Sequence, residues 1–171
     1  PWVFVQNALA LEEVVKEEAV KEIVKKTDIV PVVDNVIIYF DTSGSTDDPY
    51  LDTGMNKLQA GKELIKQRAE TMPVSDLNVG LYSFAGGVEE LYPVQPFNKD
   101  ELLKAIDKLP EKSSGATMLD IAVRHLSGIL KGLSGRTVVF LFTDGTYTKL
   151  PIAGTADPIA AAGKVAKQYD V

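Results

Sequence analysis

The apolar run VIIYF, residues 36–40, ends directly in Asp41, and the chain continues through Thr-Ser-Gly to Ser45. Consecutive apolar residues are typical of a strand that is buried on both faces, as in a parallel sheet covered by helices. Open α/β sheets bind their ligands at the carboxyl ends of such strands. Asp41, Ser43 and Ser45 therefore place a carboxylate and two hydroxyls at that edge, and oxygen donors of this kind suit Mg²⁺ or Mn²⁺.

The bulk composition fits one globular domain and excludes several kinds of site. The chain has 171 residues, 45% of them hydrophobic, which is enough for a single domain with its own core. Its formal net charge of −6 and pI near 4.8 argue against nucleic acid as a partner. With no cysteine and a single histidine, the chain cannot build thiolate or His-rich metal sites. No apolar run approaches the ~20 residues of a transmembrane helix, so we expect no transmembrane segment.

Helical and strand patterns alternate along the rest of the chain. We expect residues 1–33 to form an N-terminal helix and connector, and residues 34–171 to form the main domain. The expected helices are residues 8–26, 55–71, 99–109, 118–133 and 158–169, and the expected strands are residues 36–40, 78–84, 90–93 and 137–142. The last of these strands is expected to be the most strongly buried. This order predicts an open, mostly parallel, doubly wound α/β sheet with helices on both faces.

Three loops with small oxygen-bearing residues are expected to meet at one end of that sheet. The first holds the Asp-x-Ser-x-Ser group, the second (SSGAT) ends in Thr117 before a helix, and the third (TDG) holds Asp144 after a strand. If the two apolar strands are neighbours, the two carboxylates lie side by side and five oxygen donors converge. Two carboxylates balance one divalent charge, so a metal there stays electrophilic and has room for an outside anionic ligand.

These motifs resemble the von Willebrand factor type A (VWA) domain and its metal-ion-dependent adhesion site (MIDAS). The family pattern is Asp-x-Ser-x-Ser after the first strand, a Thr in a Gly-rich loop before a helix, and Asp-Gly after the fourth strand. The resemblance covers residues 34–171 and implies a Rossmann-like fold. It also implies a divalent cation, Mg²⁺ or alternatively Mn²⁺ or Ca²⁺. The implied metal residues are Asp41, Ser43, Ser45, Thr117 and Asp144.

Two features depart from the family pattern. The family usually continues to a fifth and sixth strand and a final helix, so we expect a domain that lacks the last strands. The serines are followed by Thr46, Asp47 and Asp48, where the family often has a bulky apolar residue. The two extra carboxylates could be solvated or could tighten ion binding, and the sequence leaves both interpretations open.

The resemblance implies a divalent-cation-dependent, adhesion-type protein-interaction module and not an enzyme. Its metal would accept an Asp or Glu carboxylate of a protein partner. The sequence around residues 33–36 is similar to that of bacterial envelope proteins in which a VWA domain precedes a peptidoglycan-binding domain. This implies a periplasmic or otherwise extracytoplasmic protein. The alternatives are a cytoplasmic subunit that docks an ATPase in a metal-insertion or remodelling complex, and a hydrolase whose metal activates water.

Overall fold

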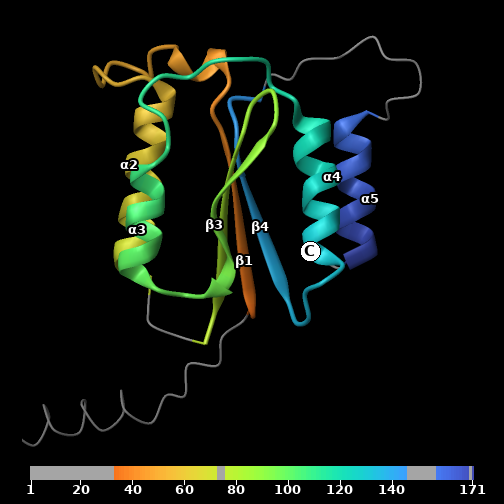
Figure 1. Ribbon diagram of the computed structural model, residues 1–171. Coiled ribbons are helices and arrows are strands. Elements are labelled where there is room, and N and C mark those ends of the chain that lie inside the picture. The colour runs from red at the N-terminus through yellow and green to blue at the C-terminus, as the bar shows by residue number, and fades with distance from the viewer. Residues whose placement is uncertain (1–32, 73–75, 146–156, 170) are drawn as a thin grey trace, which may run out of the picture. The chain divides into compact units, whose positions relative to one another are not determined.

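The computed structural model describes residues 33–72, 76–145, 157–169 and 171 (Figure 1). The predicted helix over residues 8–26 lies outside these ranges, and the domain boundary at residue 33 stays a prediction. None of the helices within these ranges is long and apolar enough to cross a membrane. The elements in chain order are β1 (Asn35–Asp41), the 3₁₀ turn η1 (Gly44–Asp47), α2 (Lys57–Thr71), β2 (Asn78–Phe84), β3 (Val88–Pro96), α3 (Lys99–Asp107), α4 (Leu119–Leu130), β4 (Thr137–Phe142) and α5 (Pro158–Tyr169).

The four strands form one open sheet in the order β3-β2-β1-β4. β1 lies between β2 and β4 and runs parallel to both, with Ile38 opposite Leu81 on one side and Phe140 on the other. β3 returns antiparallel to β2 as a hairpin. The predicted class, a mostly parallel α/β sheet, is therefore confirmed, and the two apolar strands that precede Asp41 and Asp144 are neighbours.

The sheet is covered by helices on both faces, which explains why β1 is apolar at consecutive positions (Figure 1). Val36, Ile38 and Phe40 point to one side and pack with buried residues of α2 and α3. Ile37 and Tyr39 point to the other side, where they pack with residues of α4 and α5. The carboxyl end of β1 is thus packed between two apolar layers.

The start of α2 is encoded locally, whereas its distance from the sheet depends on a glycine. Asn56 caps the helix through a reciprocal pair with Gln59, in which each side chain accepts a backbone N–H of the other. Gly61 faces β1, and a Cβ there would lie 2.8 Å from Cζ of Phe40. The absence of a side chain at this position lets α2 pack closely over the end of β1.

Several predicted boundaries are correct within a few residues, but one prediction about burial is wrong. The apolar sequence of β4 predicts the most buried strand of the sheet, yet Phe140 is 49% exposed and Leu141 is 45% exposed. β1 is buried along its whole length instead. The reason is position: within the described residues β4 is the edge strand and pairs only with β1. An apolar sequence indicates that a strand favours burial, but the adjacent strands and helices determine how much of it is covered.

Candidate metal centre

Three chain segments meet at the carboxyl end of the parallel strands. The segment after β1 is joined to the loop before α4 by two backbone hydrogen bonds: the Gly44 N–H donates to the Gly115 carbonyl, and the Ser114 N–H donates to the Thr42 carbonyl, each at 3.0 Å. Gly115 has a φ of +86°, a backbone conformation that favours glycine. These contacts place the Asp-x-Ser-x-Ser group beside the SSGAT loop, although the two are far apart in the sequence.

Asp41 is the buried carboxylate of this edge, with a relative exposure of 2%. The Ser43 N–H donates to its Oδ1 at 2.9 Å, as in an Asx turn. The Thr143 hydroxyl donates to its Oδ2 at 2.8 Å. Both carboxylate oxygens therefore accept a hydrogen bond, which compensates for part of the cost of burying the charge. Sequence reasoning did not single out Thr143, although it immediately precedes Asp144.

Three hydroxyls form a connected cluster next to this carboxylate. The Thr117 hydroxyl donates to Oγ of Ser43 at 2.7 Å. Oγ of Ser43 lies 3.4 Å from Oγ of Ser45. The Thr46 hydroxyl donates to the Ser43 carbonyl at 2.8 Å and so fixes the 3₁₀ turn that carries the serines. The structure thus brings four of the five predicted residues, Asp41, Ser43, Ser45 and Thr117, into one set of side-chain oxygens.

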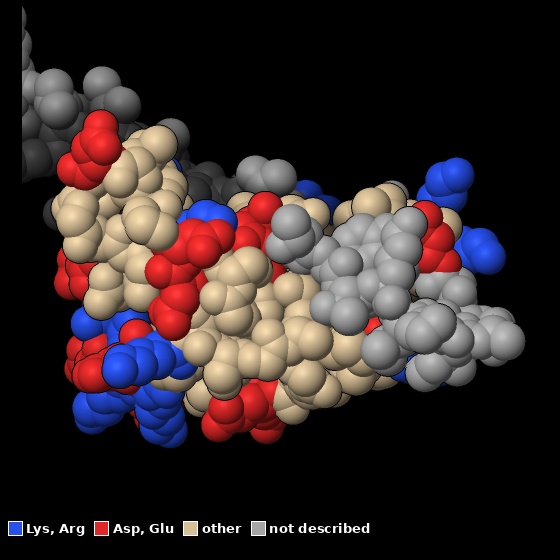
Figure 2. All heavy atoms as spheres, turned by 90° about the horizontal axis from the view of Figure 1, so that it is seen from above, with Lys and Arg blue, Asp and Glu red and all other residues tan. Residues whose placement is uncertain are grey.

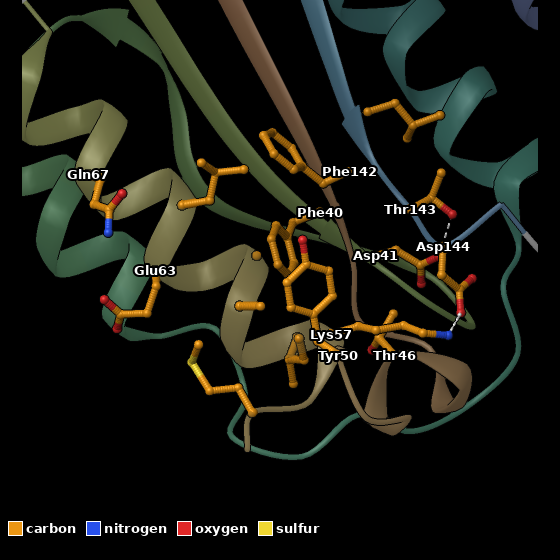
Figure 3. A pocket seen from close by; sticks show the side chains of 16 residues that line it. Phe40, Asp41, Thr46, Tyr50, Lys57, Glu63, Gln67, Phe142, Thr143 and Asp144 are labelled. Atoms are coloured by element: carbon orange, nitrogen blue, oxygen red, sulfur yellow. Dashed lines mark hydrogen bonds and ion pairs between the residues drawn. The ribbon is translucent and has the colours of Figure 1, made fainter. Parts of the chain in front are cut away.

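Asp144, the fifth predicted residue, contacts a lysine that sequence reasoning missed (Figure 3). Nζ of Lys57 lies 3.3 Å from Oδ2 of Asp144. It also lies 3.0 Å from Oδ2 of Asp48. The same ammonium donates to the Ser45 carbonyl at 3.4 Å. The pKa of Lys57 is raised above its ordinary value, chiefly by the hydrogen bond to Asp48, with Asp144 adding to it. Lys57 thereby connects Asp144 to the segment that bears the serines.

Lys57 did leave a signal in the sequence. It is the first residue of α2, directly after the Asn56 cap. A cation at a helix N-terminus opposes the helix dipole, so a lysine there is better explained by nearby acids than by the helix itself.

The two additional acids are exposed and engaged in structural contacts. Oδ1 of Asp47 accepts hydrogen bonds from the Asn56 amide at 3.1 Å and from the Ser113 N–H at 3.4 Å. Asp48 pairs with Lys57. Figure 2 looks onto this end of the molecule, where acidic side chains stand among largely uncharged surface.

The donor set suits a hard divalent cation. Within the described ranges, no three His, Cys, Asp or Glu side chains come together as a cation site. A cation at this edge would therefore depend on hydroxyl oxygens together with two carboxylates. Mg²⁺ is compatible with such a set, because it prefers oxygen ligands and keeps several of its waters.

A cavity opens beside these residues, between α2 and the end of β4 (Figure 3). Its volume is about 680 Å³, and Asp41, Lys57 and Asp144 are among its lining residues. Apolar side chains, including Phe40 and Leu141, form other parts of the wall. Charged groups and apolar surface are therefore available side by side at the same edge.

Comparison with protein families gives one match, the von Willebrand factor type A domain, over residues 36–146. The matched segment is well over half of the chain and contains β1, all three loops and Asp144. The chain belongs to the VWA family. Comparison with curated proteins gave no match.

Several solved structures share this fold. BatB, a conserved hypothetical protein of Bacteroides thetaiotaomicron, is 19% identical with a TM-score of 0.60, over 79% of this chain and 62% of that one. An aerotolerance-related membrane protein of Bacteroides fragilis is 19% identical with a TM-score of 0.59, over 78% and 62% of the two chains. The mussel byssus proximal thread matrix protein 1, with a zinc-occupied MIDAS motif, is 22% identical with a TM-score of 0.58, over 79% and 35%.

This VWA chain spans less than two thirds of each of these three structures. At sequence identities this low, the similarity shows a shared fold only.

Proposed function

We propose that this VWA domain is a divalent-cation-dependent protein-interaction module of the adhesion type. Its metal would be held by Asp41, Ser43, Ser45, Thr117 and Asp144. The observation that carries the proposal is the 2.7 Å hydrogen bond between the Thr117 and Ser43 hydroxyls, which joins two loops 74 residues apart beside a buried carboxylate. The similar mussel byssus protein has a zinc-occupied MIDAS motif, which supports a divalent cation in this domain.

The bound cation would supply a Lewis-acidic position for an outside carboxylate. The protein residues have separate tasks: Asp41 contributes negative charge from a buried position, the hydroxyls contribute neutral oxygens, and Asp144 adds a second charge from β4. Asp41 and Asp144 together neutralise one divalent cation. The proposed site has no third carboxylate of its own, so an Asp or Glu of a protein partner could take the open position on the metal. No catalytic step is required, and we propose that the domain is not an enzyme.

Calorimetric titration of Mg²⁺ and Mn²⁺ tests the metal site, with Ca²⁺ and Zn²⁺ as further probes. The wild type is expected to bind one ion, and the Asp41→Ala/Ser43→Ala double variant is expected to lose it. Because Asp41 is buried, a second variant, Thr117→Val, removes one hydroxyl while leaving the carboxylate contacts intact. Equal binding by wild type and both variants, or no binding by any, would contradict the proposal. Circular dichroism checks that each variant is folded.

An array of paired peptides tests the partner chemistry. Each peptide with an exposed Asp or Glu is matched with the same peptide carrying Asn or Gln. Retention is expected only for the acidic member and only with Mg²⁺ or Mn²⁺ present. Binding that persists in EDTA, or that ignores the change from acid to amide, would contradict recognition through a metal-bound carboxylate.

We also propose an extracytoplasmic, envelope-associated setting, since two of the similar structures are proteins of Bacteroides and one of these is a membrane protein. Fusion of the natural full-length protein to a reporter that is active only outside the cytoplasm tests this. An inactive reporter together with co-purification of an ATPase would favour the cytoplasmic alternative.

A further inference from the structure

We propose that Lys57 is a built-in competitor of the metal: its ammonium holds Asp144 in the metal-free protein and thereby weakens cation binding. This inference rests on the proposed metal site and adds a residue that sets its affinity. The Lys57 ammonium is a positive charge beside the site where the cation is expected to bind.

The geometry around Nζ of Lys57 supports this role. Three oxygens from two chain segments surround the ammonium: Oδ2 of Asp48 at 3.0 Å and the Ser45 carbonyl at 3.4 Å from the turn after β1, and Oδ2 of Asp144 at 3.3 Å from the end of β4. Asp144 and Ser45 both belong to the proposed metal site. The ammonium therefore already neutralises part of the charge that a divalent cation would use.

Local helix stability does not account for this lysine. The α2 N-terminus is closed by the reciprocal cap of Asn56 and Gln59, which leaves Lys57 no role in starting the helix. Its charge opposes the dipole at this position. The compensation for that unfavourable placement comes from the two acids, one of which is the predicted metal residue.

The two acidic partners of Lys57 differ in exposure, which would allow a cation to replace the lysine at one of them. The Asp144 side chain is 8% exposed, whereas that of Asp48 is 64% exposed. When a cation takes Asp144, the lysine can remain on Asp48 near the surface. The exchange still costs one ion pair and leaves an ammonium close to a divalent cation, and both effects lower metal affinity.

The test compares metal affinities of charge-removing and charge-keeping variants. Lys57→Met keeps the length of the side chain and removes its charge, and Lys57→Gln is a second neutral variant. Lys57→Arg keeps the charge. Lys66→Met is the matched control, because Lys66 lies on the same helix and forms a comparable ion pair with Asp107 at 2.6 Å, away from the site.

We expect both neutral variants to bind Mg²⁺ and Mn²⁺ roughly tenfold more tightly in calorimetry, since a nearby unit charge is removed. Lys57→Arg and Lys66→Met should stay close to the wild type. Equal or weaker binding by the neutral variants, or an equal gain in Lys66→Met, overturns this inference while leaving the proposed function intact. No binding by the wild type or by any Lys57 variant overturns both.

Discussion

The Thr143 hydroxyl donates a 2.8 Å hydrogen bond to Oδ2 of Asp41, which joins the end of β4 to the end of β1. The two residues are 102 positions apart in the chain. This bond keeps the Asp41 carboxylate in place from one side, while the Ser43 N–H holds it from the other. It also brings the neighbouring Asp144 to the edge where the three loops meet.

Replacing Thr143 by Val should destabilise the domain, because the variant has the same shape but leaves a buried carboxylate oxygen without its donor. The expected loss in the free energy of unfolding is about 1–3 kcal/mol, measured by urea denaturation. Thr143→Ser keeps the hydroxyl and should lose less. Equal stability of the Val variant and the wild type would mean that this contact does not contribute.

Removing the Thr117 hydroxyl should weaken metal binding specifically. Thr117→Val is expected to bind Mn²⁺ and Mg²⁺ at least about tenfold more weakly, and Thr117→Ser should retain most of the affinity. Thr46→Val is the matched control, since Thr46 is another buried threonine of the same edge whose hydroxyl bonds a backbone carbonyl. It should lower stability without changing metal affinity. Similar affinity losses in the Thr117→Val and Thr46→Val variants would point to general disruption of the edge.

Two helical glycines should respond in opposite ways to alanine. Gly61→Ala places a Cβ 2.8 Å from Cζ of Phe40, a ring that is buried and stacked against Phe142, and should reduce the free energy of unfolding by about 1–3 kcal/mol. Gly128 in α4 has no atom within 4 Å of an added Cβ. Gly128→Ala should therefore raise stability by about 0.5–1 kcal/mol through helix propensity. Thermal or urea unfolding measures both, and a stabilised Gly61→Ala variant would contradict the close packing of α2.

Stability should decline at alkaline pH because of a buried tyrosine. Burial raises the pKa of Tyr82 to about 12, with the nearby Glu90 carboxylate adding to the shift. The unfolded chain loses this proton near pH ~10, whereas the folded domain keeps it. The folded state then binds more protons, so its stability is complete below pH ~10 and falls as the pH rises toward 12.

Urea titrations at a series of pH values above 9 measure this slope. Tyr82→Phe should reduce the slope without abolishing it, because burial also raises the pKa of Tyr39. Tyr50→Phe changes an exposed tyrosine and serves as the control. An unchanged slope in Tyr82→Phe would refute the assignment.

Most of the fold could be predicted because its signals are local or periodic. The consecutive apolar residues of β1 and β4, the cap at Asn98 and the Gly-Gly turn between β2 and β3 each act over a few residues. The parallel sheet then follows from their order. The burial of β4 could not be predicted in this way, because Phe140 and Leu141 carry no information about which elements flank their strand.

The same distinction between local sequence signals and tertiary packing applies to the candidate site. The kinds of oxygen donor and their placement after strands or before a helix can be read from the sequence, because they depend on residue type and on element ends. That Thr117 contacts Ser43, that Thr143 contacts Asp41 and that Lys57 reaches Asp144 was decided only in the tertiary structure. Each of these contacts joins side chains between 74 and 102 residues apart, and only the packing of helices onto a particular strand order determines such distances.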